Sequence, residues 1–254
     1  MSVIVNLGCG TRVSPLCINY DWSPYARLAR HPRIVRLIAP LIGAERAARL
    51  RSVVGCVEPC DLRRGIPLPD GSADAVYSSH VLEHFDRNRV EPYLKDIRRV
   101  LAPSGVLRIV VPDLHQLAVE YLEAFHAASK GSVGSGEVEE RIGAMFEQSV
   151  RRRSRAVPEH APEWIARAGT AVFGDARRRG ETHQWMWDPI TLGSVLEQAG
   201  FDRIAQVDCA TSRIPNWDRI DLDRDGNREY KPGSLYLEAQ RPSPHVANEP
   251  DRSR

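Results

Sequence analysis

Two histidines and one glutamate stand close together in the segment SSHVLEHF. If a helix begins at His80, the spacing i, i+3 and i+4 places His80, Glu83 and His84 on one face. Histidine can take up a proton near neutral pH, so these side chains could supply a general base. The structural alternative is that they cap a helix and bond the neighbouring loop.

Two imidazoles and a carboxylate on one face could also bind a divalent metal ion. The sequence offers no clear further ligands for such a site, which commonly uses three or four protein ligands. Cys56 and Cys60 likewise lack the second pair that would complete a zinc site. We therefore predict no bound metal, although the segment at 80–84 leaves that alternative open.

A third histidine, His183, precedes the aromatic run at 185–187. This segment could return over the site as a lid and offer a base and an apolar wall to an acceptor molecule. Large aromatic side chains are at least as often simply core. Asp113 and His115 follow a predicted strand, where Asp113 could cap the next helix. The predicted catalytic residues are His80, His84 and His183.

A second group of residues, near the N-terminus, is suited to binding a ligand. Gly8 and Gly10 end an apolar run, and glycine adopts backbone angles closed to other residues while presenting no side chain. Asp21 ends the next apolar run and can accept two hydrogen bonds from a ribose diol. Gly-Cys-Gly alone is weak evidence, because a tight turn explains it about as often.

Further residues of this kind follow later strands. Asp61 can accept a hydrogen bond from an exocyclic amine, and Leu62 can pack on a purine face. Because all these residues lie at successive strand ends, they outline a site for an adenosine-containing ligand. The predicted cofactor-binding residues are Asn6, Gly8, Gly10, Asp21, Asp61, Leu62 and Ser79.

Alternating strands and helices must position these residues. Apolar runs predict strands, and apolar residues at helical spacing predict helices. Segment 23–54 is rich in Ala, Leu and Arg and is broken by Pro32 and Pro40, which predicts two or three short helices, with Ser23 capping the first. The predicted strands cover residues 3–7, 17–20, 57–60, 74–79, 106–112, 204–209 and 234–239, the last two as an antiparallel pair, and further helices cover 87–101, 114–128 and 190–199.

This alternation predicts an α/β fold with a mostly parallel sheet and helices on both faces. Ligands bind such sheets at the carboxyl ends of the strands. We expect a single domain over residues 1–241, with a helical insertion at about 23–54 and a lid or acceptor-binding insertion at about 115–187. Patterning is weak over 129–182, which includes the linker-like KGSVGSGE and the basic run RRRSR. Residues 242–254 are expected to be a disordered tail.

Composition limits the partners and the cellular compartment that we expect for this chain. The net charge of +2 over 254 residues does not favour duplex nucleic acid as a partner. No apolar run reaches the roughly 20 residues needed to cross a bilayer, and the N-terminus lacks the pattern of a signal peptide. Five scattered cysteines, an odd number, favour reduced thiols, so we expect a cytoplasmic protein.

Four segments, in order, carry a resemblance to a known family: VNLGCGTRV, INYDW, CDLRRGIPLPDGSADAVYSSHVLEHF and RRVLAPSGVLRIVVPDL. They resemble the class I S-adenosylmethionine-dependent methyltransferases, and in particular the bacterial type with a type-11 methyltransferase domain. The resemblance covers about residues 3–114 and resumes at HQWMWDPITLGSVLEQAGF and SLYLEA. It implies a seven-stranded Rossmann-like sheet with a reversed last strand, and S-adenosylmethionine as cofactor.

By that resemblance, the glycine turn would approach the amino-acid part of the cofactor and Asp21 would hold its ribose. Residues 61–62 would contact the adenine, and the backbone at 79–80 would lie near the sulfonium. The chain departs from the family pattern in one place, because only TRVSPLCINY separates Gly10 from Asp21 where many members have a full helix. Pro15 disfavours a long helix there, so we expect a short loop.

Methyl transfer from a sulfonium is an in-line displacement to which proximity and orientation contribute strongly, and a base is needed only for a hydroxyl or a protonated amine. We predict transfer to a small molecule or a glycan precursor, at oxygen. The alternatives are an RNA or protein methyltransferase, with RRRSR as a contact, and a non-catalytic protein that binds the cofactor. A dinucleotide-binding oxidoreductase fits less well, because GCGTRV lacks the third glycine and the acid follows too soon.

Overall fold

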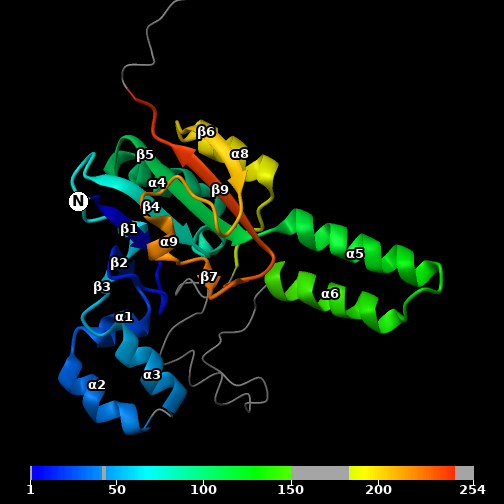
Figure 1. Ribbon diagram of the computed structural model, residues 1–254, viewed down its shortest axis with the longest axis horizontal. Helices are drawn as coiled ribbons and strands as arrows, with labels where there is room; N and C mark the ends of the chain where they lie inside the picture. The colour runs from blue at the N-terminus through cyan, green and yellow to red at the C-terminus, as the bar shows by residue number, and fades with distance from the viewer. Residues whose placement is uncertain (1, 42–43, 150–182, 244–254) are drawn as a thin grey trace, which may run out of the picture.

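A computed structural model describes residues 2–41, 44–149 and 183–243. Its centre is a seven-stranded sheet in the order β3-β2-β1-β4-β5-β9-β6 (Figure 1). The strands are β1 (Ile4–Leu7), β2 (Ile18–Asp21), β3 (Glu58–Pro59), β4 (Ala73–Ser79), β5 (Leu101–Pro112), β6 (Asp202–Val207) and β9 (Ser234–Gln240). The predicted α/β fold with its seven strands is confirmed.

Strand direction identifies the edge at which a ligand would bind. The five strands from β3 to β5 pair in parallel, whereas β9 runs antiparallel to both β5 and β6, as predicted for the closing pair. From β1 the chain moves outward to β2 and β3 and then returns to β4 on the other side of β1. The carboxyl ends of β1 and β4 therefore flank a topological switch point, the usual binding site of such sheets.

Helices and loops cover both faces of this sheet. One face packs against α4 (Arg87–Val100) and α8 (Pro189–Gln198), and the other packs against the segment that includes α9 (Trp217–Ile220). Successive side chains of β5 point to opposite faces of the sheet. Leu107 and Ile109 therefore lie in the core on the first face, and Val110 lies in the core on the second. Burial on both faces explains why residues 106–112 of β5 are apolar except for Arg108.

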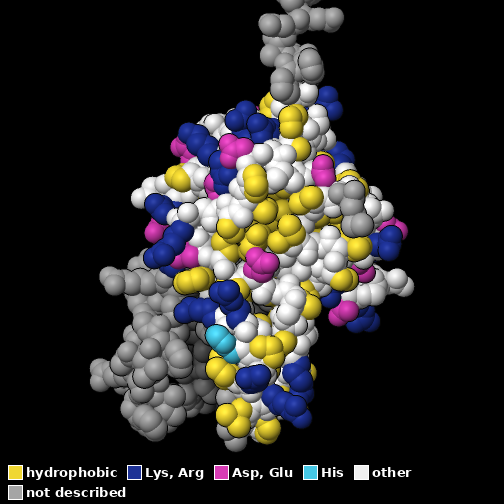
Figure 2. Space-filling view, turned by 90° about the vertical axis from the view of Figure 1, so that its left-hand side faces the viewer, with side chains coloured by type: hydrophobic (Ala, Val, Ile, Leu, Met, Phe, Trp, Pro, Cys, Tyr) yellow, Lys and Arg dark blue, Asp and Glu magenta, His cyan; other side chains and the backbone are white. Residues whose placement is uncertain are grey.

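A separate group of short helices packs below β2 and β3 (Figure 1). It comprises α1 (Pro24–Ala29), α2 (Pro32–Ile38), the 3₁₀ turn η1 (Ala39–Leu41) and α3 (Ala44–Val53), as predicted for segment 23–54. The Ser23 hydroxyl accepts from the Ala26 amide, which confirms the predicted cap. In Figure 2, Lys and Arg side chains lie among hydrophobic ones at this lower end. A larger group of hydrophobic side chains occupies the middle of the same face.

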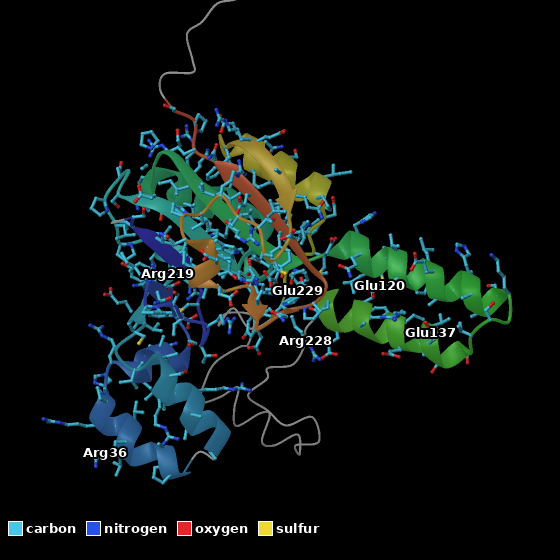
Figure 3. All side chains as sticks on the ribbon, viewed as in Figure 1. Arg36, Glu120, Glu137, Arg219, Arg228 and Glu229 are labelled. Atoms are coloured by element: carbon cyan, nitrogen blue, oxygen red, sulfur yellow. The ribbon has the colours of Figure 1, made fainter. Side chains whose placement is uncertain are left out.

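A helical hairpin projects from the opposite side of the sheet (Figure 1). It consists of α5 (Leu114–Ser129) and α6 (Ser135–Ser149), and Figure 3 labels Glu120 on the first and Glu137 on the second. An ion pair between Arg141 and Glu120, at 3.2 Å, links the two helices. The reading of KGSVGSGE as a linker was wrong from Ser135 onward, because its small residues form the first turn of α6.

Other departures from the predicted elements are small. β6 spans 202–207 rather than 204–209, and β5 begins at Leu101, so that the expected turn at 103–105 lies inside it as an irregularity. Ser104 has a φ of 63°, which accommodates that bend. The remaining short elements are η2 (Leu62–Arg64), η3 (Leu82–His84), β7 (Arg224–Asp225) and β8 (Arg228–Glu229).

Some predictions concern residues outside the described ranges. The RRRSR run, residues 150–182 of the predicted lid insertion and nearly all of the predicted tail lie outside the described residues. Across the helices that the structure does describe, none combines the length and apolar character needed to cross a membrane.

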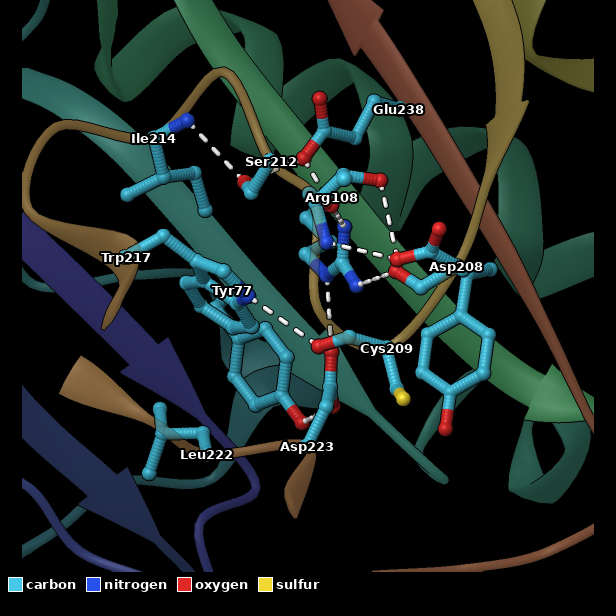
Figure 4. Close-up of polar contacts among 12 residues, drawn as sticks. Tyr77, Arg108, Asp208, Cys209, Ser212, Ile214, Trp217, Leu222, Asp223 and Glu238 are labelled. Atoms are coloured by element: carbon cyan, nitrogen blue, oxygen red, sulfur yellow. Dashed lines mark hydrogen bonds and ion pairs between the residues drawn. The ribbon is translucent and has the colours of Figure 1, made fainter. Parts of the chain in front are cut away.

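A cluster of buried charges ties the sheet to the segment before β7 (Figure 4). Arg108 on β5 is fully buried, and its Nε donates to Asp223 Oδ2 at 2.8 Å while its Nη1 donates to Glu238 Oε1 at 3.0 Å. The Tyr77 hydroxyl donates to the other oxygen of Asp223. Glu238 Oε2 accepts from the backbone amide of Arg213 at 3.0 Å. All four carboxylate oxygens of this cluster are thus hydrogen-bonded.

Candidate functional site

The predicted glycine turn lies at the carboxyl end of β1, followed by the predicted short loop. Gly8 and Gly10 have φ values of 66° and 54°, in the left-handed region that favours glycine. A Cβ on Gly8 would collide with the Val81 side chain, so this glycine allows the turn to pack on the segment after β4. A Cβ on Gly10 would meet nothing within 4 Å. A ligand can therefore approach the backbone at Gly10.

Asp21 is buried at the carboxyl end of β2, where it holds the glycine turn. Its Oδ2 accepts from the Gly10 amide at 2.9 Å, and its Oδ1 accepts from the Ser23 amide at 2.6 Å. Each carboxylate oxygen keeps a second lone pair, so the side chain can still accept hydrogen bonds from a diol. The structure thus shows a positioning role for Asp21 that the sequence did not reveal.

Asn6 is buried on β1 and stabilises the loop that follows. Its Nδ2 donates to Asn19 Oδ1 and to the Arg12 carbonyl, both at 2.9 Å. Asn19 in turn donates to the Ser14 carbonyl at 2.9 Å. The shape of the loop therefore depends on a buried amide pair, and a direct contact between Asn6 and a cofactor stays a prediction.

Asp61 and Leu62 follow β3, and Ser79 ends β4, at the same edge of the sheet. Asp61 caps η2 and pairs with Arg63 through Nε at 2.7 Å and Nη2 at 2.9 Å. The hydrogen bond from Arg63 lowers the pKa of Asp61, so this carboxyl is ionised at neutral pH. Leu62 is partly buried against the main core, and Ser79 is the last residue of β4. The Cys60 amide donates to the Asp21 carbonyl at 2.9 Å, which joins this end to β2.

The segment after β4 places a fully buried carboxylate next to the glycine turn. His80, with a φ of 53°, directly follows the strand, and its Nδ1 lies 3.2 Å from Glu83 Oε1. The other ring nitrogen of His80 lies 3.1 Å from the Ser234 hydroxyl. Among the described residues, neither oxygen of Glu83 has a hydrogen-bond partner of acceptable geometry.

Two further histidines face this carboxylate. The Nε2 atoms of His84 and His183 each lie 4.0 Å from Glu83 Oε1, and the two rings meet edge to face with centroids 4.8 Å apart. His183 is held here because the backbone amide of Gln184 donates to the Glu83 carbonyl at 2.6 Å. The structure therefore brings together all three predicted catalytic histidines. They surround Glu83, which we named beside them from the sequence but did not include among the predicted catalytic residues.

The charge state of Glu83 follows from its surroundings. Burial alone would raise its pKa, but the facing imidazoles of His80, His84 and His183 outweigh this effect and hold the pKa at about 2. An ionised carboxylate without hydrogen bonds is costly inside a protein. The cluster can therefore hold a positive charge, either as a proton on a ring or as a bound cation.

The other candidate residues take mainly structural positions. Trp187 is fully buried in the main core, as the core alternative predicts, whereas Trp185 is partly exposed, and the Arg87 guanidinium lies 4.7–4.8 Å from both rings. Asp113 caps α5 by accepting from the amides of His115 and Gln116 at 2.9 and 3.2 Å. Neither Asp113 nor the exposed His115 joins the cluster around Glu83.

Comparisons with known proteins find one family that matches and several solved structures that are similar. The methyltransferase domain family matches this chain over residues 34–109. The DhpI–SAH complex is 16% identical, with a TM-score of 0.45, over 96% of this chain and 78% of that one. A SAM-dependent methyltransferase from Archaeoglobus fulgidus is 15% identical, with a TM-score of 0.44, over 94% and 86%.

A possible exported protein from Bordetella parapertussis is 14% identical, with a TM-score of 0.44, over 95% of this chain. This chain spans only 62% of that protein's length. No curated protein matches the chain.

Proposed function

We propose that this chain is a class I S-adenosylmethionine-dependent methyltransferase and that it transfers the methyl group to a hydroxyl oxygen of a small molecule or a glycan precursor. One observation carries the choice of oxygen. The cluster of Glu83, His80, His84 and His183 adjoins the glycine turn, because Val81 packs directly against Gly8. A hydroxyl acceptor needs such a group to remove its proton, whereas a neutral amine does not.

The residues at the sheet edge fit S-adenosylmethionine, which supplies an activated methyl group when bound. The open backbone at Gly10 leaves room for the amino-acid part, and Asp21 retains lone pairs for the ribose hydroxyls. We keep Asp61, Leu62 and Ser79 as the proposed adenine and sulfonium contacts, and Asn6 as a further one. Holding donor and acceptor in line would provide much of the rate enhancement.

Within the cluster, we propose that His80 acts mainly by positioning Glu83. The Ser234 hydroxyl donates to the Lys231 carbonyl at 2.7 Å, so toward His80 Nε2 it can only accept. Because the other ring nitrogen faces Glu83, both nitrogens of His80 are engaged. We therefore assign removal of the proton from the acceptor hydroxyl to His84 and His183 rather than to His80.

The test is a transfer assay with isotopically labelled S-adenosylmethionine and a panel of sugars, phenols and amines. We expect product with hydroxyl acceptors and its loss in Asp21→Ala, while Asp218→Ala, an exposed acid on α9, serves as the matched control. Transfer to amines alone would contradict the proposal.

RNA is the second candidate acceptor, and the surface of α1–α3 favours it. Exposed arginines of these helices are Arg27, Arg30, Arg33, Arg36, Arg49 and Arg51. Transfer to RNA that falls steeply with salt would support this alternative, because binding to phosphates releases counterions.

We also propose that the protein acts in the cytoplasm of a bacterium, as the resemblance of its motifs suggests. All five cysteines are free thiols in the structure, which suits a reducing compartment. Formation of a disulfide in the purified native protein would argue against this placement.

A further inference from the structure

We propose that Glu83, His84 and His183 form a binding site for a divalent transition-metal cation. One ligand atom from each residue lies within 4.8 Å of the other two. Glu83 and His84 are neighbours on η3, and His183 comes from a segment 99 residues further along the chain. This third residue is the ligand that the local sequence around position 83 lacks.

The carboxylate of Glu83 is the first evidence for a cation. Its side chain has no exposed surface. Within the described part of the chain, neither of its oxygens has a hydrogen-bond partner. Native proteins rarely leave a buried charge in this state, so such a group points to a ligand. The oxygen nearest the rings faces all three imidazoles.

The orientation of His183 is the second, independent observation. Its Nδ1 is hydrogen-bonded to the Gln148 carbonyl, which can only accept, so this nitrogen carries the proton. In a neutral ring, Nε2 then presents its lone pair toward Glu83. Histidines that bind metals nearly always donate their other N–H to a carbonyl or carboxylate, which fixes tautomer and orientation. Gln148, at the end of α6, supplies that carbonyl.

The ligand types select the class of metal. Two imidazoles and one carboxylate suit zinc and neighbouring transition metals, whereas magnesium and calcium prefer oxygen ligands alone. Bonds of about 2.0–2.1 Å in a tetrahedron put the ligand atoms roughly 3.3 Å apart. The 4.0 Å separations from Glu83 Oε1 would need to close by less than an ångström, and a separation at the 4.8 Å limit by about 1.5 Å. Side-chain rotation can supply that change.

Three protein ligands leave a fourth position open, which is typical of catalytic rather than structural sites. If the proposed function holds, the hydroxyl of the acceptor could occupy this position, where the cation lowers the pKa of a bound oxygen. With the metal bound, His84 and His183 would then act through the cation and not as bases themselves. Only this last step rests on the proposed function. The metal site itself stands on the geometry of Glu83, His84 and His183.

The experiment is a titration of the full-length chain, stripped with a chelator and dialysed, with Co²⁺ followed by visible absorption and with Zn²⁺ followed by calorimetry. We expect one ion per chain, at least about tenfold weaker binding in Glu83→Gln and in His183→Gln, and little response to Mg²⁺. His126→Ala, an exposed histidine on α5, should bind like the wild type. Cys56→Ser should also bind normally, which excludes a site at this exposed thiol.

Two results would overturn the proposal: no Co²⁺ or Zn²⁺ binding by the wild type, or unchanged binding in both Glu83→Gln and His183→Gln. Circular dichroism and titration with S-adenosylmethionine on the same variants separate loss of the metal from loss of the fold. Metal binding without methyl transfer to any hydroxyl acceptor would refute the proposed function but would still support the proposed metal site.

Discussion

Two clusters of buried charged side chains differ in how fully their hydrogen bonds are made. Around Arg108, in the cluster of Figure 4, all four oxygens of Asp223 and Glu238 accept a hydrogen bond from a described residue, although the bond from Arg213 is not drawn there. Around Glu83, neither oxygen does so within the described chain, although three imidazoles lie within 4.0 Å.

This difference separates a structural cluster from a functional one. The cluster of Arg108 contains two guanidinium groups, those of Arg108 and Arg213, against the carboxylates of Asp223 and Glu238, so its charges are balanced. It joins β5 and β9 to the segment at 208–223. The cluster of Glu83 lies at the carboxyl edge of the sheet, beside the glycine turn. Its charge is balanced only when a proton or another cation is added. We infer that the cluster of Arg108 maintains the fold and that the cluster of Glu83 binds a ligand.

Removal of the central cation should have the largest effect. In Arg108→Met, Asp223 and Glu238 would be buried without their partner, which typically costs about 3–5 kcal/mol of unfolding free energy. Denaturant unfolding followed by circular dichroism measures this loss. A loss below about 1 kcal/mol would mean that water reaches the cluster and that its burial is unimportant.

Removal of one neutral donor from the same cluster should cost less. Tyr77→Phe deletes the hydroxyl that donates to Asp223, and a hydrogen bond to a charged group contributes about 1.5–3 kcal/mol. The ring would still pack against Trp217 at 5.5 Å. The same unfolding assay serves here, and an unchanged midpoint would show that Asp223 has another donor in solution.

The pH dependence of stability should reveal a smaller contribution from Glu238. Burial alone would raise the pKa of Glu238, but hydrogen bonds from Ser212 and Arg213 lower it overall. Its stabilising effect is therefore present above the unfolded pKa, about 4.3, and is lost as the pH falls through the folded pKa. The melting temperatures of wild type and Glu238→Gln should thus differ most at pH 7 and converge toward pH 3. A constant difference would contradict this assignment.

The smallest effect on stability is expected at the other cluster. Glu83→Gln removes a carboxylate whose charge the three imidazoles stabilise but that accepts no hydrogen bond from a described residue, so in the presence of a chelator we expect a smaller loss than in the variants above. A loss as large as that of Arg108→Met would show that Glu83 is a structural ion-pair partner, and the contrast between the clusters would fail.

The sequence predicted well what depends on local pattern. Apolar runs located every long strand of the sheet, and Pro32 with Ser23 indicated the breaks and the cap of the short helices. The short loop between Gly10 and Asp21 was also predicted, because proline and turn residues disfavour a helix there.

The sequence could not show what depends on contacts between distant residues. Arg108 reads as one polar interruption in an apolar strand, and its partners lie 115 and 130 residues away. The amide pair of Asn6 and Asn19 required the register of β1 against β2. α6 was missed because glycine and serine in its first turn resemble a linker. His183 was named as a candidate, but only the backbone contact of Gln184 with Glu83 explains its position.

The most direct test of the account is a calorimetric titration of the purified chain with S-adenosylmethionine and, separately, with its demethylated product. We predict saturable binding of both, weakened by about 1.5–3 kcal/mol in Asp21→Ala and unchanged in Asp218→Ala. Because Asp21 also holds the Gly10 and Ser23 amides, Asp21→Asn with a check of melting temperature separates binding from folding. Absence of binding by the folded wild type, or full affinity in Asp21→Ala, would contradict the proposed site at the carboxyl edge of the sheet.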